Sequence, residues 1–348
     1  MLLIFWLRLR CTRRVLLPVL LLGALGAAAD AGEPEDLPTL PGYDRSSAHD
    51  LNNRGQAVGQ ALRTDFALPR QAILWAKRRS KRTTVEPLPT LDGMVDGDAS
   101  AIARSGIPIG VSSIRVGNST LFRAVIWKKV RGEWEATELE PPPGYTEAIA
   151  ADVNSRGQAV GWAFNPGEIV NGDVVRSAVV WQPVRGQAHT VVVLETPEGF
   201  QSTATGINEL GDVVGRAYRT EVDDTGTGTF ERSNVVVWRR VPRHHGLHHR
   251  GHPGSTRTPV VLPSTPGLPR NTAGAINLFG HVVATATGLV NGTQTTRPVF
   301  WKRRLWKRGG PPYENPVVLP VPEGFSDASA TDINVFGKVV GSAFAPEL

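Results

Sequence analysis

Five closely spaced histidines have the most direct potential for chemistry: His244, His245, His248, His249 and His252. Neutral imidazoles can bind Zn²⁺, Cu²⁺ or Ni²⁺, and His-rich tracts often do so. Arg243, Arg250 and Arg257 lie in or beside the tract and oppose a cation. The tract therefore predicts a loop insertion with weak, adventitious metal binding and no tightly held cofactor. A specific metal site is the alternative.

Two acidic segments carry the oxygen ligands that Ca²⁺ prefers. One contains Asp92, Asp96 and Asp98, and the other begins a Gly/Thr-rich stretch with Asp223 and Asp224. Neither segment has the ligand spacing of a complete calcium-binding loop. Both are predicted to be polar loops without a bound metal.

No catalytic residue can be assigned from a motif. The chain contains neither Gly-x-Ser-x-Gly nor His-Glu-x-x-His. Asp50, Asp152 and Asp332 share one offset before a repeated asparagine. Groups that repeat at equivalent positions are expected to serve the fold, because a catalytic site needs different groups converging at one place.

Basic residues form runs that recur directly after an apolar strand. The runs are Lys77–Arg82, Lys128–Lys129, Arg239–Arg240 and Lys302–Arg304. Equivalent positions lie on one rim of a repeat protein, where such runs could attract a polyanion or an anionic surface. The alternative is a set of solvated loops that guard hydrophobic strands against aggregation. Nucleic acid is not an expected partner, because no recognition motif is present.

A repeated phrase sets the positions of these residues: Asn-x-x-Gly-x, then two apolar residues and Gly or Ala. It occurs at 52–59, 154–161, 208–215, 277–284 and 334–341, with a degenerate copy at 103–110. Asparagine at the first position of a tight turn bonds to the backbone two residues on, and glycine at the fourth takes a positive φ. Each copy therefore predicts a hairpin corner, with turn glycines at Gly55, Gly106, Gly157, Gly211, Gly280 and Gly337.

Two further strands are predicted in each repeat. One is an apolar run without polar alternation, which is typical of a strand covered on both faces. It ends in a tryptophan: Trp75, Trp127, Trp181, Trp238 or Trp301. The other is a short run around a leucine, first seen at Leu37 to Leu40.

A period of about 50 residues with four strands per repeat favours an all-β fold, a six-repeat β-propeller of roughly four-stranded blades. The tryptophan strand occurs five times and the other elements six times, so one blade is expected to be incomplete. A β-solenoid is the competing architecture. The single repeat domain is predicted at 37–348, after a linker at 30–36.

The order of these elements resembles the HAF-repeat family of bacterial extracellular proteins. The resemblance rests on Ala-x-x-Trp, a short leucine strand, a Pro/Gly-aromatic turn and Ala-x-x-Ile-Asn-x-x-Gly-x-Val-Val-Gly, and it covers nearly the whole chain after residue 37. Where the family tends to show His-Ala-Phe, this chain has Gln71-Ala72-Ile73, Arg123-Ala124-Val125 and Ser177-Ala178-Val179. The resemblance implies export and a repeat β-fold, and it transfers no catalytic residue.

Residues 1–29 have the layout of a secretory signal peptide, with arginines, an apolar stretch at 15–25 and small residues up to Ala29. A twin-arginine signal at Arg13–Arg14 and an uncleaved anchor are the alternatives. Four of the 38 basic residues and none of the 32 acidic residues lie in this segment, so the exported chain carries a net charge of only +2. The only cysteine, Cys11, also lies there, so no disulfide is expected.

These observations predict an exported, non-enzymatic repeat protein that acts as a binding or surface-interaction scaffold. Its partner would be an extracellular protein, a glycan or an anionic surface, with no membrane span left after signal cleavage. The expected location is extracellular, cell-surface or periplasmic. The alternative is a propeller hydrolase or lyase that acts on an extracellular polymer, because propellers also host such enzymes.

Overall fold

The computed structural model describes residues 36–77, 83–170, 172–222, 229–240, 257–304 and 311–345. In these ranges the chain is all-β, as predicted, and it forms no helix. The same ranges accordingly contain no helix with the length and apolarity needed to cross a membrane. The strands all belong to one compact unit, Leu37–Leu348.

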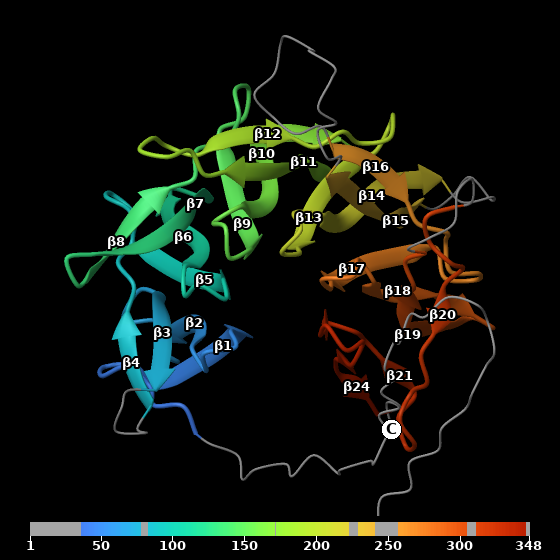
Figure 1. Ribbon diagram of the computed structural model, residues 1–348, viewed down its shortest axis with the longest axis horizontal. Coiled ribbons are helices and arrows are strands. Elements are labelled where there is room, and N and C mark those ends of the chain that lie inside the picture. Colours follow the sequence, from blue (N-terminus) through green and yellow to red (C-terminus); the bar gives the residue numbers. More distant parts are fainter. Residues whose placement is uncertain are drawn as a thin grey trace, which may run out of the picture. The chain divides into compact units, whose positions relative to one another are not determined.

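Each of the first four repeats forms a four-stranded antiparallel sheet whose strands follow chain order (Figure 1). Sheet 1 contains β1 (Arg45–Leu51), β2 (Ala57–Leu62), β3 (Gln71–Lys77) and β4 (Thr83–Pro87). Sheet 2 contains β5 (Asp96–Ile102), β6 (Pro108–Val116), β7 (Ser119–Val130) and β8 (Glu133–Glu138). Sheet 3 contains β9 (Glu147–Val153), β10 (Ala159–Val170), β11 (Asp173–Gln182) and β12 (Thr190–Val193). Sheet 4 contains β13 (Gln201–Ile207), β14 (Val213–Val222), β15 (Thr229–Arg240) and β16 (Arg257–Val261).

The fifth repeat keeps this pattern, and the sixth departs from it. Sheet 5 contains β17 (Arg270–Ile276), β18 (Val282–Val290), β19 (Thr293–Trp301) and β20 (Val317–Val318). One parallel pair, Ser233 opposite Arg270, joins it to sheet 4. The sixth repeat forms two short pairs, β21 (Asp327–Ala328) with β24 (Ala343–Phe344) and β22 (Asp332–Ile333) with β23 (Val339–Val340). No tryptophan strand is seen in the described part of this repeat, in agreement with the count of five.

The repeated phrase forms the predicted turns. All six turn glycines have a positive φ, between 71° and 91°. In the first turn the Asn52 side-chain oxygen accepts hydrogen bonds from the backbone amides of Arg54 and Gln56, at 2.9 and 3.1 Å. Asparagine therefore holds the turn closed, and glycine supplies a backbone conformation that other residues rarely adopt.

The last glycine of the repeated phrase has a role that the sequence pattern did not predict, which is to make room for the backbone of the paired strand. A Cβ atom on Gly161 would lie 1.9 Å from the carbonyl oxygen of Ile149 in the paired strand β9. In β9, Asp152 pairs with Val160 and Ala150 pairs with Gly161, so Ala151 is an extra residue in a β-bulge. The absence of a side chain lets the bulged strand approach. Equivalent bulges occur in β1, β5, β13 and β17.

The five strand-ending tryptophans lie at equivalent, fully buried places, each with 1% or less of its surface exposed. Each indole nitrogen donates a hydrogen bond to a backbone carbonyl oxygen within or just after the preceding leucine run. For example, Trp127 bonds to Pro89 at 2.7 Å and Trp238 to Glu195 at 2.6 Å. Burying an indole stabilises the fold by up to about 5 kcal/mol, since about 200 Å² leaves water.

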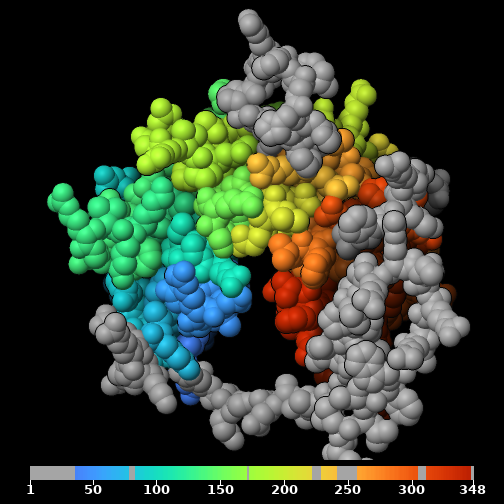
Figure 2. Space-filling model, in the orientation of Figure 1, coloured from blue at the N-terminus to red at the C-terminus, as the bar shows by residue number. Residues whose placement is uncertain are grey.

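Turn asparagines also link neighbouring repeats. The Asn52 amide nitrogen donates to the carbonyl oxygen of Ala103 at 3.1 Å, and Asn208 donates to Asn277 at 3.0 Å. Each acceptor occupies the equivalent position in the next repeat. Because Ala103 has no side-chain amide, it cannot donate the corresponding hydrogen bond to the third repeat. The first strands of successive sheets also contact one another, and neighbouring sheets pack directly together (Figure 2).

Candidate functional site

Two of the predicted sites lie outside the described residues. These are the histidine tract, His244 to His252, and the acidic pair Asp223–Asp224. Metal binding by either remains a prediction.

The three other candidate calcium ligands do not converge on one point. The predicted polar loop is wrong for two of them, because Asp96 and Asp98 lie in strand β5. The Asp96 carboxylate accepts a hydrogen bond of 2.8 Å from the backbone amide of Arg70. Asp98 pairs with His49 of sheet 1 at 3.0 Å, a contact that raises the pKa of the imidazole. Asp92 is exposed. Among the described residues, no three His, Cys, Asp or Glu side chains lie together in a way that could hold a metal ion.

The repeated aspartates bond across repeats. The Asp152 carboxylate accepts a hydrogen bond of 2.7 Å from the Ile207 amide of sheet 4, and Asp50 accepts one of 2.8 Å from the Ile102 amide of sheet 2. Burial raises the pKa of Asp152 to about 7, with smaller contributions from the charges of Asp50 and Asp332. Three carboxylates from different repeats thus lie within electrostatic range of one another.

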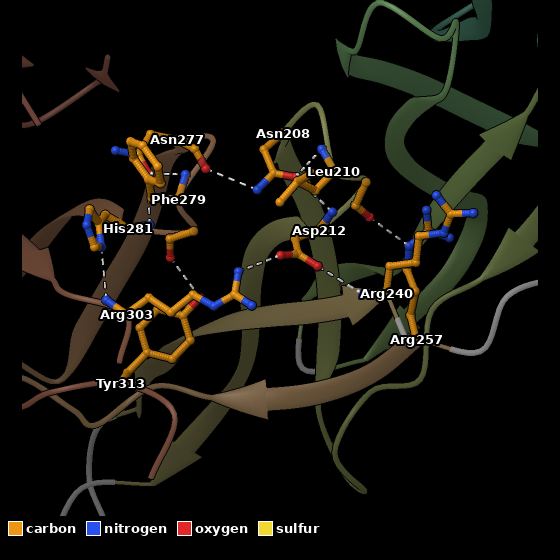
Figure 3. A network of polar contacts seen from close by, with 12 residues as sticks. Asn208, Leu210, Asp212, Arg240, Arg257, Asn277, Phe279, His281, Arg303 and Tyr313 are labelled. Carbon is orange, nitrogen blue, oxygen red and sulfur yellow. Dashed lines mark hydrogen bonds and ion pairs between the residues drawn. The ribbon is translucent and has the colours of Figure 1, made fainter. Parts of the chain in front are cut away.

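The basic runs have different surroundings. Residues 78–82 lie outside the described ranges. Lys129 pairs with Glu86 at 3.2 Å and lies over the ring of Trp134, 4.9 Å from its centre. Arginines of the two later runs lie together where sheets 4 and 5 meet (Figure 3). This junction is the candidate functional site.

The junction differs from earlier repeats at the fourth position after the turn asparagine. In sheet 3 this position holds Gln158, whose side chain accepts a hydrogen bond from its own asparagine. In sheets 4 and 5 it holds Asp212 and His281. Each accepts the backbone amide of an arginine instead, Arg240 to Asp212 and Arg303 to His281, both at 3.0 Å (Figure 3).

A largely buried ion pair crosses the junction. The Arg303 guanidinium lies 3.1 Å from the Asp212 carboxylate, and their side chains are only 15% and 7% exposed. Arg303 packs on the turn glycine Gly280, where an added Cβ would lie 2.6 Å from the arginine side chain. Tyr313 donates its hydroxyl to the Gly280 carbonyl oxygen at 2.9 Å, and burial raises its pKa. Both carboxylate oxygens of Asp212 therefore have partners, the backbone amide of Arg240 and the guanidinium of Arg303.

Arg257 is the unusual residue of this site. It begins β16, is only 7% exposed, and lies directly opposite Arg240 of β15. Its Nε donates to the Gly211 carbonyl oxygen at 3.2 Å, but its Nη2 is buried with no hydrogen-bond partner among the described residues. Burial, and then the charge of Arg240, lowers the pKa of Arg257 to about 10. The Nε of Arg239 is also buried without a partner within the described ranges.

The turns beside these arginines expose apolar side chains. Leu210 and Phe279 are each 48% exposed, at the position held by Arg54 and Arg156 in repeats 1 and 3. This end of sheets 4 and 5 therefore combines cationic and apolar groups.

Three clefts lie between neighbouring sheets at the opposite end, near the β10–β11, β14–β15 and β18–β19 hairpins. Their volumes are about 230, 380 and 840 Å³. Among the described residues, each of the three is lined by one ionisable side chain, Arg219, Arg270 or Asp327. In this part of the chain, none of the three clefts brings together two titratable groups for acid–base catalysis.

Sequence patterns indicated only part of the arginine site. The runs Arg239–Arg240 and Lys302–Arg304 were visible, whereas the contributions of Asp212, His281 and Tyr313 were not. One usable signal was present, because Asp212 and His281 replace a glutamine in the repeated phrase. No protein-family model matches this chain, and no curated protein is detectably similar to it.

Proposed function

We propose that this chain is an exported, non-enzymatic repeat protein that acts as a binding scaffold and is related to the HAF-repeat family. The observation that carries the proposal is the use of its recurring polar groups. The turn asparagines, the tryptophan indoles and two of the repeated aspartates bond to backbone groups between repeats. Variation is left to the turns and to the loops after the tryptophan strands, where a repeat protein presents its binding surface.

We further propose that the six repeats close into a β-propeller. Support comes from two exposed side chains at the ends of the series. Leu51 is 66% exposed, whereas its equivalents in the other five repeats are 4 to 8% exposed. Val340 is 61% exposed, whereas its equivalents are fully buried. Packing of the sixth repeat on the first would cover both residues, as Val58 and Ile102 cover each other.

Cross-linking tests this closure. A Leu51→Cys, Val340→Cys double variant should be joined by a short bifunctional thiol reagent, and a Leu68→Cys, Val340→Cys variant should not. Equal yields for the two pairs would argue for an open array such as a solenoid.

The functional test uses the secreted protein. N-terminal sequencing should begin close to residue 30. The purified chain should attach to envelope fractions, a glycan or an extracellular protein, and should release no product from cell-wall or extracellular polymers. An intact N-terminus on the exported protein would contradict the signal-peptide assignment. Cleavage of a polymer would contradict the proposal of a non-enzymatic scaffold.

One observation favours the alternative, a propeller hydrolase or lyase. Asp152 has a pKa near neutrality beside two other carboxylates, an arrangement that can serve proton transfer. An Asp152→Asn variant that folds but loses polymer cleavage would establish the enzyme.

A further inference from the structure

We propose that Arg240 and Arg257 form a binding site for a tetrahedral oxyanion, a phosphate or sulfate group, beside the Gly211 turn of sheet 4. The site specifies the partner class of the proposed scaffold and in that sense rests on the proposed function. Phosphate and sulfate share the required chemistry, which is concentrated negative charge with several hydrogen-bond acceptors.

The first argument is an imbalance of charge. Like charges directly opposite each other on paired strands are destabilising, and Arg240 and Arg257 are such a pair. Arginines are seldom fully buried without a partner, yet Arg257 is 7% exposed. The nearby carboxylate, Asp212, is already paired with Arg303. Residues 241–256, which connect Arg240 to Arg257 along the chain, include no Asp or Glu, so this segment cannot supply a carboxylate either.

The second argument is unused hydrogen-bond donors. Buried N–H groups in native proteins are almost always bonded, and an orphan commonly marks the place of an ion or a water. Within the described residues Arg257 Nη2 is such a donor, and Arg240 lies on the same face of the sheet because the two residues are directly paired. A guanidinium matches the oxygens of phosphate or sulfate with two parallel N–H bonds, which makes arginine the preferred residue for these groups.

The arrangement of the two arginines also leaves a path by which an oxyanion can enter from solvent. Arg257 is buried and is held through its Nε, whereas Arg240 opposite is exposed to solvent. Arg303, Asp212 and Tyr313 are bonded to one another or to the turns. An oxyanion entering from solvent would meet Arg240 first and could then reach the unpartnered Nη2 of Arg257.

Thermal unfolding and calorimetry of the full chain test the site. Inorganic phosphate or sulfate should raise the melting temperature in a saturable way that sodium chloride at the same ionic strength does not reproduce. Arg257→Gln and Arg240→Gln should each weaken binding by about tenfold, the loss of one charge-assisted contact. Without phosphate, Arg240→Gln should melt no lower than the parent chain, because it removes a repulsion and the residue is exposed.

Arg115→Gln is the matched control, since Arg115 is an exposed arginine of sheet 2. It should keep the full phosphate response. Equal responses of the parent chain and both junction variants, or an equal effect of chloride, would overturn the site. If Arg257→Gln fails to fold, the Arg240→Gln comparison decides the matter alone.

A second experiment distinguishes a lipid headgroup from a soluble or polymer-borne anion as the source of the oxyanion. Vesicles containing phosphatidylglycerol should bind the chain if a lipid headgroup supplies the phosphate, and Leu210→Ser with Phe279→Ser should then weaken vesicle binding but not binding of inorganic phosphate. Vesicle binding that is absent or insensitive to these changes assigns the site to a soluble or polymer-borne anion. Attachment to envelope fractions with no phosphate response would overturn the oxyanion site but leave the scaffold proposal intact. A phosphate response without any attachment would support the oxyanion site and contradict the scaffold proposal.

Discussion

The Asn154 side chain donates a hydrogen bond to the backbone oxygen of Asn208, its counterpart one repeat later, over 3.2 Å. Its own oxygen accepts the backbone amides of Arg156 and Gln158, at 3.1 and 3.2 Å. One side chain thus closes a local turn and ties two sheets together. This double use explains why asparagine, and not the similar aspartate, begins most copies of the phrase.

Replacing Asn154 by Asp should destabilise the chain by about 2 to 3 kcal/mol, because the amide donor is lost and a carboxylate faces the oxygens of Asn208 and Gln158. Urea unfolding measures the change. Asn53→Asp, at an exposed turn position, should cost less than about 0.5 kcal/mol. Similar losses for both variants would contradict the link between repeats.

Three glycines of the third repeat should rank in a fixed order when changed to alanine. Gly161→Ala should cost more than about 3 kcal/mol, because its Cβ would collide with backbone at 1.9 Å. Gly157→Ala should cost about 1 to 2 kcal/mol, because its φ of 74° is strained for other residues. Gly167→Ala, with nothing within 4 Å of the new atom, should be nearly neutral. Any other order of melting temperatures would refute one of the two roles.

Trp238→Phe should cost about 2 to 4 kcal/mol, since it leaves the buried carbonyl of Glu195 without its 2.6 Å partner and opens a cavity. Trp162 is partly exposed, and no hydrogen bond to its indole is seen in the described residues. Trp162→Phe should therefore cost less than half as much in chemical denaturation. Equal costs would show that indole burial alone, without the bond, accounts for the tryptophan strands.

Stability should depend on pH through Asp152. Its folded-state pKa of about 7 is above the value of about 3.9 in an unfolded chain. The stabilising contribution of the protonated carboxyl is complete below about pH 4 and is lost as the pH rises through 7. Urea midpoints should therefore fall between pH 5 and pH 8, and Asp152→Asn should flatten this change. An unaltered slope in the variant would assign the pH dependence to other groups.

Deleting His244 to His252 should leave the melting temperature nearly unchanged, because the length of a loop has little effect on its closure entropy. A large loss of stability would mean that the tract is part of the fold. Titration with Zn²⁺ should detect only weak binding to the parent chain. Sub-micromolar binding that disappears on deletion would establish the tract as a specific metal site.

Local patterns were sufficient to predict the turns, the order of the strands and the buried tryptophans. Glycine at positive φ and asparagine bonded two residues on are short-range properties, and strand burial follows from runs such as Val235 to Trp238, which lack polar residues. These features depend on neighbours within a few residues, so a single sequence contains the necessary information. The shortage of one tryptophan strand could be counted in the same way.

Partners between repeats depended on the tertiary structure. The ion pair of Asp212 with Arg303 joins residues 91 positions apart, and the Asn154 link spans 54. Which side chains meet across such distances depends on how neighbouring sheets pack and on where each bulge turns the first strand. From the sequence, Arg257 could be recognised only as a positively charged residue. Its burial opposite Arg240, with donors left unbonded, followed from the pairing of β15 with β16, because strand register places the two arginines face to face.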